Sequence, residues 1–316
     1  MTDPCCGVGA MSKLAIGLAS GTQTRMDFIH FTPNITKTLS DGSGNTIRGT
    51  LDHSGNSVAQ GMLHVKFRTS FYMTAAKMDV LLPCLGFTES TDVWTLGNVL
   101  PLSTVVVGPS GAPEDTYSGC VPTDFVIMGR KGQDPVVIDI GWIGKTWASA
   151  AAGTFFTSQS SPAMTEGYAY PFAATGSGNA SSLNILGQSL AFPQFRLSMD
   201  YKILEEFNNS VTATNLCPSD HVLKFATSAL YSTCDGNTDL WTEPMGGDIT
   251  GASLTMNFQR LVGAANHQTQ VVVANAKLIA RAPEIKKNDY NRLPVNAVGY
   301  ATDAAALLVI TNHVGT

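Results

Sequence analysis

The chain has 316 residues, of which 44% are hydrophobic and only 14% are charged, and its formal net charge is −5. The acidic balance speaks against an ordinary nucleic-acid-binding protein, because such proteins carry a basic patch and a high isoelectric point. Soluble globular proteins have about 25% charged residues, so two interpretations are open. One is an extracellular β-protein with a Ser-, Thr-, Asn- and Gly-rich surface; the other is a subunit covered by neighbours, since interface cores are depleted in charge.

The N-terminal region predicts neither a secretory signal nor a membrane anchor. Residues 1–21 lack a basic segment followed by an apolar one. No stretch of the sequence approaches the ~18 apolar residues of a membrane-spanning helix. The six cysteines have no CxxC spacing, so we expect four buried small side chains and two cysteines in a loose N-terminal segment, not a zinc site. The sequence therefore predicts a soluble protein made in a cytoplasm.

Strand signals dominate along the chain. Residues 26–31 alternate apolar and polar side chains before a Pro-Asn turn, and residues 62–71 do the same, with Leu63, Val65 and Phe67 on one face. The turns between strands are rich in Gly, Asn, Asp and Pro, which is typical of antiparallel β-structure. Further strands are predicted at 103–107, 124–128, 136–143, 194–204, 252–260, 268–280 and 307–311.

Two segments have helical spacing. Residues 74–85 place an apolar stripe along one face, with Thr74 as the N-cap and Gly86 just past the end. Residues 219–231 repeat apolar side chains at helical spacing after a Pro-Ser-Asp start, which predicts a second helix. The alternation from Val222 to Phe225 leaves a strand open as the alternative.

A central stretch from Ala148 to Ser182 is rich in small residues and has the composition of a linker or crossover arm. A similar order is predicted on either side of it, in which the strand at 62–71 and the helix at 74–85 correspond to the strand at 194–204 and the helix at 219–231, each followed by further strands. We therefore expect a first β domain in residues 1–150, a linker or arm in 151–182 and a second, similar β domain in 183–316. The predicted fold class is mainly β with flanking helices (α+β), built as a sandwich or barrel from two similar repeats.

No set of catalytic or metal-binding residues is evident in the sequence. A GxSxG elbow is absent, and the six histidines have no HExxH or HxH neighbours. Glu205 and Glu206 follow a strand, so their carboxylates are expected on opposite faces. The four tryptophans are scattered, which favours core or interface packing over sugar stacking. The sequence predicts a protein that is not an enzyme and holds no cofactor or metal.

An ordered set of motifs in residues 47–150 resembles a known family. The predicted helix contains Asp79-Val80-Leu81-Leu82-Pro83 and is followed by a segment from Trp94 to Pro101 with Thr-Leu-Gly and Leu-Pro. A Tyr-Ser-Gly-Cys turn at 117–120 precedes two strands, the second of which closes in Gly144-Lys145. Each motif is weak alone, and their order carries the specificity. In this order they resemble the tail tube proteins of siphophages, the bacteriophages with long, non-contractile tails.

The resemblance implies a structural virion protein with a tail-tube-type β-sandwich or barrel and a flanking helix. Rings of such subunits stack into the hollow tail tube through which phage DNA is ejected. A duplicated subunit implies a trimeric ring with pseudo-sixfold symmetry, and a single-copy subunit implies a hexamer. The implied partners are further copies of the chain and the tape measure, tail terminator and baseplate proteins, while DNA passes without specific binding. The implied location is the virion tail, after synthesis in the host bacterial cytoplasm.

Three regions are expected to serve assembly. Residues 36–60 predict a long hairpin or loop between rings, residues 148–182 an arm, and the strands at 62–71, 124–128 and 136–143 the inner barrel. An acidic or neutral lumen is expected, because it does not bind phosphates. The candidate lumen-facing residues are Asp139 and Asp200. The candidate inter-subunit residues are Asp41, Gly42, Asn45, His53, Asn56, Phe155, Phe156, Tyr168 and Tyr170.

Two alternatives to the tail tube stay open. One is another ring-forming tail component, such as a terminator or baseplate hub. The other belongs to a different class, a β-sandwich carbohydrate-binding or adhesion protein. An enzyme is the least favoured class, since no catalytic arrangement is evident.

Overall fold

The computed structural model describes residues 12–41, 58–108, 112–130, 135–158, 168–172, 180–190, 192–230, 252–262, 264–279, 282, 292–302 and 306–315. Within these residues the chain is mainly β-structure with one ten-residue helix and one short helix. No described helix is long and apolar enough to cross a membrane.

Ten strands and both helices come from the first half of the chain and the stretch that follows it. They are β1 (Lys13–Leu18), β2 (Thr24–Met26), β3 (His30–Asp41), β4 (Val58–Tyr72), α1 (Ala75–Cys84), β5 (Phe87–Ser90), β6 (Val93–Leu96), β7 (Ser103–Gly108), β8 (Glu114–Arg130), β9 (Val137–Gly144), β10 (Thr146–Ala150) and α2 (Thr154–Ser158). The second half adds β11 (Ala180–Ile185), β12 (Gln188–Leu190), β13 (Gln194–Glu206), β14 (Asn215–Leu230), β15 (Ala252–Val262), β16 (Ala265–Ile279), β17 (Arg292–Gly299) and β18 (Val309–His313).

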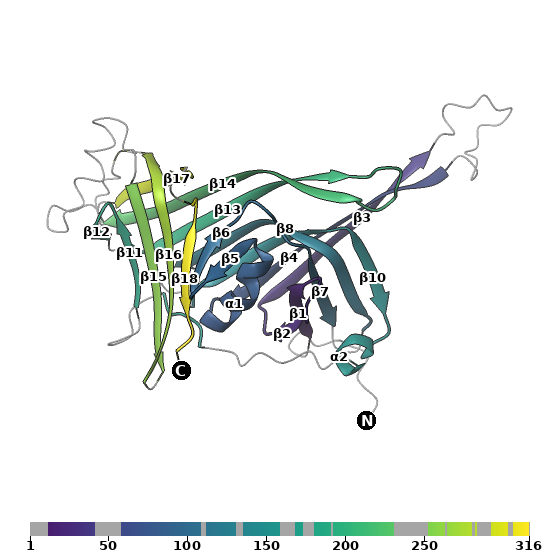
Figure 1. The fold of residues 1–316 in the computed structure, drawn as a ribbon, viewed down its shortest axis with the longest axis horizontal. Coiled ribbons are helices and arrows are strands. Elements are labelled where there is room, and N and C mark those ends of the chain that lie inside the picture. The colour runs from purple at the N-terminus through teal and green to yellow at the C-terminus, as the bar shows by residue number, and fades with distance from the viewer. Residues whose placement is uncertain are drawn as a thin grey trace.

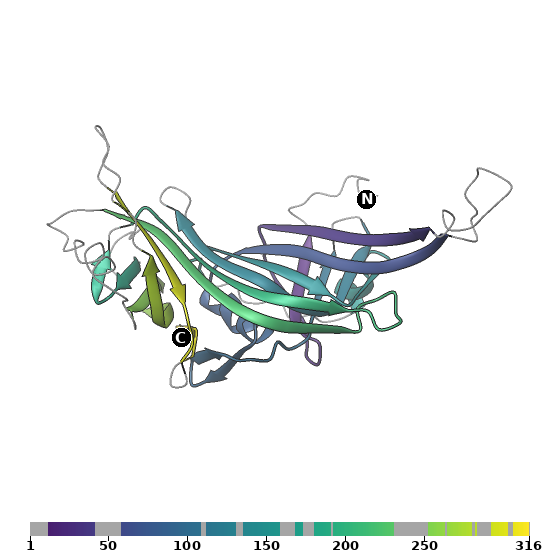
Figure 2. The same cartoon turned by 90° about the horizontal axis from the view of Figure 1, so that it is seen from above.

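The longest strands form one antiparallel sheet, called the long sheet, in the order β3-β4-β9-β8-β13-β14-β17-β16. Two strands also belong to smaller sheets. The first part of β8 pairs with β7 and β10, and the first part of β16 pairs with β15 and β18. Figure 1 shows the long strands running above α1, with β1, β7 and β10 at one end and β11, β15, β16 and β18 at the other. Figure 2 shows the long strands from above.

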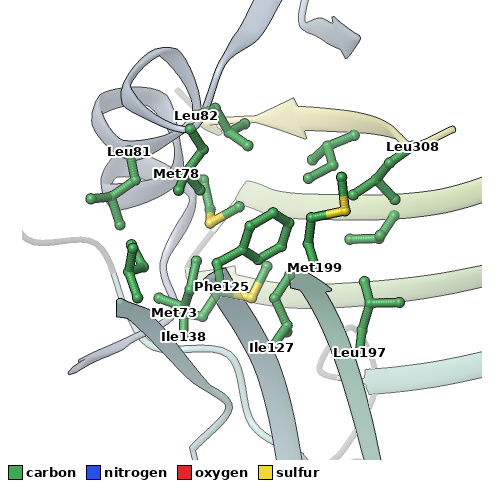
Figure 3. Packing of buried hydrophobic residues seen from close by; sticks show 14 of the residues in the cluster. Met73, Met78, Leu81, Leu82, Phe125, Ile127, Ile138, Leu197, Met199 and Leu308 are labelled. Carbon is green, nitrogen blue, oxygen red and sulfur yellow. The ribbon is translucent and has the colours of Figure 1, made fainter. Parts of the chain in front are cut away.

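One face of the long sheet is the hydrophobic core. Along β13, Phe195, Leu197, Met199 and Tyr201 are buried, whereas Arg196 and its alternates point the other way. This period of two is what a strand with one covered face requires. Figure 3 shows side chains of α1 above those of β8, β9 and β13. Each fully buried Leu, Met, Ile or Phe contributes about 1.5–3 kcal/mol to folding, so this packing joins α1 firmly to the sheet.

The predicted helix at 74–85 and its N-cap are confirmed. The Thr74 hydroxyl accepts a hydrogen bond from the backbone N–H of Lys77 at 3.1 Å, and Gly86, with φ of 86°, follows the last turn. A buried contact ties the helix to the end of the chain: the side-chain amide of Asn312 on β18 donates to the Ala75 carbonyl at 2.9 Å and to an Asp79 carboxylate oxygen at 2.5 Å.

The predicted helix at 219–231 is wrong, because the described part of this segment belongs to strand β14. Leu223, Phe225 and Ala229 are buried while Lys224 is exposed. The segment pairs with β13 on one side and β17 on the other, so tertiary pairing overrides its ambiguous helical spacing. The predicted strand at 26–31 is also only partly correct, since β2 ends at Met26 and β3 begins at His30.

The expected linker at 151–182 is in part structured. Strand β10 pairs with β8 just before it, and α2 lies within it. Tyr170 bonds through its backbone to Met73 and Val136. The two expected domains meet along one continuous sheet, because residues 124–130 of β8 pair with residues 194–200 of β13.

The strand pairings of the first half recur in the second among the described residues. In the first half the pairs are β1–β2, β1–β7, β3–β4, β4–β9, β7–β8, β8–β9 and β8–β10. In the second half they are β11–β12, β11–β15, β13–β14, β14–β17, β15–β16, β16–β17 and β16–β18. Each pair in the first list has its counterpart at the same place in the second.

Candidate functional site

The face of the long sheet opposite α1 is called the open face, because the described helices and the smaller sheets pack on the other side. It presents alternate side chains of all the long strands. One row across it, in register, consists of His30, Ser70, Asp139, Val126, Ser198 and Lys224. The next row contains Arg68, Gly141, Asp124 and Asp200. The structure thus places both lumen candidates, Asp139 and Asp200, on the same face.

Asp139 belongs to a hydrogen-bonded cluster around Arg68. The Arg68 Nε donates to Asp139 Oδ2 at 2.9 Å, and another guanidinium nitrogen pairs with the Asp124 carboxylate. Burial is the largest single influence on the pKa of Arg68 and lowers it, but the hydrogen bonds and charges of Asp139 and Asp124 together raise the pKa above its ordinary value. Asp139 is therefore an ion-paired carboxylate in a cluster that connects three neighbouring strands.

Gly141 makes room for this cluster. A Cβ atom at position 141 would lie 2.2 Å from an oxygen of Asp124 and 2.6 Å from the Thr123 hydroxyl. The Asp124 side chain thus folds over the backbone of β9, which brings its carboxylate to Arg68 on β4. Sequence reasoning missed both Arg68 and Gly141, whose roles depend on the order of strands in the sheet.

Ser70, His30 and Asp139 lie together, but not in the order that nucleophilic catalysis needs. The Ser70 hydroxyl donates to Asp139 Oδ1 at 2.7 Å, while His30 Nε2 is 3.4 Å from the same hydroxyl. A catalytic histidine takes the serine proton and is itself oriented by the acid, whereas here the acid holds the serine directly. The Ser70 side chain is also 2% exposed. The arrangement is that of a structural hydrogen-bond chain.

Asp200 differs from Asp139, because its side chain is exposed and has no ion-pair partner among the described residues. It faces Asp124 across β8 and Val222 across β14. Its carboxylate is therefore available to whatever approaches the open face.

Glu205 fastens the end of the β13–β14 hairpin to β4. Its carboxylate contacts His64 Nδ1 at 2.8 Å and Lys66 Nζ at 3.3 Å. The adjacent Glu206 accepts instead from the Asn215 side chain at 3.1 Å. The two carboxylates thus have separate partners and do not form a paired acid site.

Two inter-subunit candidates, Phe155 and Phe156, lie on α2. The buried carboxylate of Glu114 holds this helix, accepting from the backbone N–H of Gly153 at 2.9 Å and from those of Phe155 and Phe156. The two rings pack edge to face with centroids 5.0 Å apart. Both side chains are half-buried, so part of each ring stays open to a neighbour.

The two tyrosine candidates have opposite environments. Tyr168 is 57% exposed, with the Arg260 guanidinium 5.7 Å from its ring centre, so it is accessible to another subunit. Tyr170 is fully buried, and its hydroxyl hydrogen-bonds Thr269 at 2.9 Å. Tyr170 therefore packs in the core of its own chain, and its expected inter-subunit contact is wrong.

The remaining assembly candidates are the last residue of β3 and residues between β3 and β4 in the sequence. Asp41 is the last residue of β3, and nothing is described of its side chain. Gly42, Asn45, His53 and Asn56 lie outside the described residues.

No cluster of His, Cys, Asp or Glu suited to a metal is found among the described residues. In comparisons with known proteins, no family model matches the chain, and no curated protein matches its sequence.

Proposed function

We propose that this chain is a structural subunit that joins edge to edge with its copies into a ring, and that the rings stack into a phage tail tube. The observation that carries the proposal is the recurrence of one strand-pairing scheme in both halves, joined through β8 and β13. Each half is called a module, and the two modules are joined by the pairing of β8 with β13. The same kind of pairing can join one subunit to the next.

A short sequence repeat supports the equivalence of the halves. Val65 on β4 faces Gly144 on β9, and Leu223 on β14 faces Gly299 on β17. When these two pairs are aligned, four of the next five residues are identical between the strands. They are Lys66 and Lys224, Phe67 and Phe225, Thr69 and Thr227, and Ser70 and Ser228.

The same alignment makes β3 the counterpart of β13. Phe31 faces Thr69, just as Phe195 faces the equivalent Thr227. Strand β13 uses both of its edges, but β3 pairs only with β4 among the described residues. An unpaired edge of a twelve-residue strand is prone to join another strand. In the proposed ring, β3 of one copy continues the long sheet of the next, and closure removes all free edges.

Three copies then form a ring of six modules, with the open face turned toward the channel. The subunit acts mechanically as a non-enzymatic wall. Its proposed partners are its own copies and the tape measure, terminator and baseplate proteins of a virion tail, and DNA is the passing cargo. Low surface charge suits a protein whose surface is largely covered by neighbours.

Negative-stain microscopy of the purified protein tests this function. We expect rings or hollow tubes. Rings that never stack would favour a tail terminator or hub. A strictly monomeric protein that binds glycans would contradict the proposal and favour the adhesion class.

A further inference from the structure

The open face is more basic than the chain as a whole. The whole chain has a net charge of −5. On the described part of the open face, acids are outnumbered by bases, with five carboxylates against eight cations. The acids are Asp124, Asp139, Asp200, Glu206 and Asp220, and the bases are Lys66, Arg68, Arg130, Arg196, Lys202, Lys224, Lys277 and Arg292.

Most of the acids are already paired. Arg68 pairs with Asp124 and Asp139, and Lys202 pairs with Asp220. The base Lys66 is paired as well, with Glu205 near the end of β13. Three other cations, Arg130, Arg196 and Lys224, are exposed and have no ion pair or hydrogen bond through their side chains within the described part of the chain. These three are called the basic diagonal.

The basic diagonal crosses three adjacent strands. Arg196 on β13 faces Met128, so Arg130 on β8 is its diagonal neighbour; Arg196 also faces Ala226, so Lys224 on β14 is diagonal to it on the other side. Diagonal neighbours in an antiparallel sheet are ~7–8 Å apart. This spacing is comparable with that of successive phosphates along a nucleic-acid strand.

The diagonal begins in a groove of about 670 Å³ at one end of the open face. Arg130 and Arg196 line this groove together with Tyr72, whose side chain is 45% exposed. An exposed aromatic ring beside unpaired guanidinium groups suits a nucleic acid, whose phosphates can contact the guanidinium groups and whose bases can stack on the ring. A cationic or neutral partner would suit this surface less well.

We propose that the basic diagonal binds the phosphate backbone of DNA, without reading its sequence. Unpaired cations are attracted to phosphates and release their condensed counterions, which gives affinity that falls with salt. This inference goes beyond the tube, because the open face of one subunit already carries the complete diagonal. The inference replaces the expected acidic or neutral lumen surface with a line of weak phosphate contacts. Asp200, which is diagonal to Lys224, weakens these contacts through its negative charge.

Fluorescence anisotropy of a labelled DNA duplex, titrated with the full-length protein at several salt concentrations, tests the proposal. The test variant is the triple change Arg130→Gln, Arg196→Gln and Lys224→Gln. We expect it to lose most of the affinity, and the slope of log Kd against log salt to fall by about three, one for each lost phosphate contact. Asp200→Asn should tighten binding.

A matched control removes three cations from strands outside the long sheet, with Lys13→Gln, Arg25→Gln and Arg260→Gln. It changes the net charge equally and should bind DNA like the wild type. Thermal melting checks that all variants fold. Equal losses in both triple variants, or no binding by the wild type at low salt, would overturn the proposal. Displacement of DNA by poly-glutamate at equal charge would overturn it in favour of an acidic protein segment.

Tube formation is scored separately by microscopy on the same variants. If the protein binds DNA through the basic diagonal but forms no rings, the proposed tube function is contradicted and the DNA-binding inference is supported. If the wild-type protein forms tubes but does not bind DNA, the tube function is supported and the DNA-binding inference is contradicted.

Discussion

At one pair of equivalent positions, the first half of the chain has Arg68 on β4 and the second half has Ala226 on β14. Arg68 pairs with both Asp124 and Asp139 and holds these two acids against the sheet. The second half lacks such a cluster among its described residues, and its Lys224 stays unpaired. The halves thus share a strand-pairing scheme but differ on the open face. The first half has the Arg68 ion-pair cluster, and the second half contributes two of the three cations of the basic diagonal, Arg196 and Lys224.

The largest expected loss of stability comes from replacing the equivalent phenylalanines of β4 and β14. Phe67→Ala and Phe225→Ala each empty a buried site, which costs about 3–5 kcal/mol. Phe67 also contacts the rings of Phe31, Tyr117 and Trp142, and such contacts add about 0.5–1.5 kcal/mol each. Chemical denaturation at one protein concentration should therefore rank Phe67→Ala as the more damaging change. The opposite ranking would contradict the packing described for the first half.

Removing the arginine that only the first half possesses should have a smaller effect. Arg68→Ala leaves two part-buried carboxylates side by side without a cation, at a cost of about 1–3 kcal/mol. Adding Asp124→Asn and Asp139→Asn should recover much of the loss. The control Lys202→Ala breaks only an exposed pair and should change the melting temperature little. If the asparagine changes do not rescue Arg68→Ala, the cluster is not held by charge.

The two lumen candidates separate under the same substitution. The side chain at position 200 is exposed, so Asp200→Lys should leave the tubes intact. The change adds a cation beside the basic diagonal, so we expect slower DNA ejection from virions that carry it. Asp139→Lys disrupts the Arg68 cluster and should lower stability first. Ejection rates of the Asp200→Lys virions are compared with wild type by dye uptake into released DNA. Equal rates would refute the expected slowing.

The smallest effect concerns the contact between α1 and β18, which joins the two halves. Burial raises the pKa of Asp79, with help from Glu89 and Asp92 and against the hydrogen bond from Asn312. Because the folded-state pKa is raised, folding favours the protonated acid, and stability is lost as pH rises through that pKa. Asp79→Asn should therefore increase the free energy of unfolding at neutral pH by less than about 1 kcal/mol, because solvent screens part of the effect. Thermal melting should show this as a small rise in melting temperature. The gain should vanish as pH falls below the ordinary pKa of aspartate; a gain that persists in acid would contradict this cause.

Local patterns in the sequence predicted much of the fold. The helix with its Thr74 cap and the strands that became β7, β9 and β13 follow from short-range spacing. The apolar residues of β14 fit both the helical and the strand period, so the sequence predicts a helix there. Only the pairing of the segment with β13 and β17 makes it a strand.

Contacts between strands that are distant in the sequence could not be predicted from local residue patterns. The pairing of β8 with β13 and the place of Gly141 beside Arg68 depend on strand order. One signal was present: the repeated Lys-Phe-x-Thr-Ser of residues 66–70 and 224–228 aligns β4 with β14. The sequence interpretation instead matched residues 62–71 with 194–204. The predicted strands alone suggest Asp139 and Asp200 as lumen-facing residues, and the structure puts both on one face.

The number of subunits in a ring tests the equivalence of the halves most directly. Native mass spectrometry of isolated rings, combined with class averages from microscopy, measures mass and symmetry on the same particles. We expect three copies of the chain in a ring that shows six similar lobes. Six copies in a ring, or a monomer at all concentrations, would contradict it.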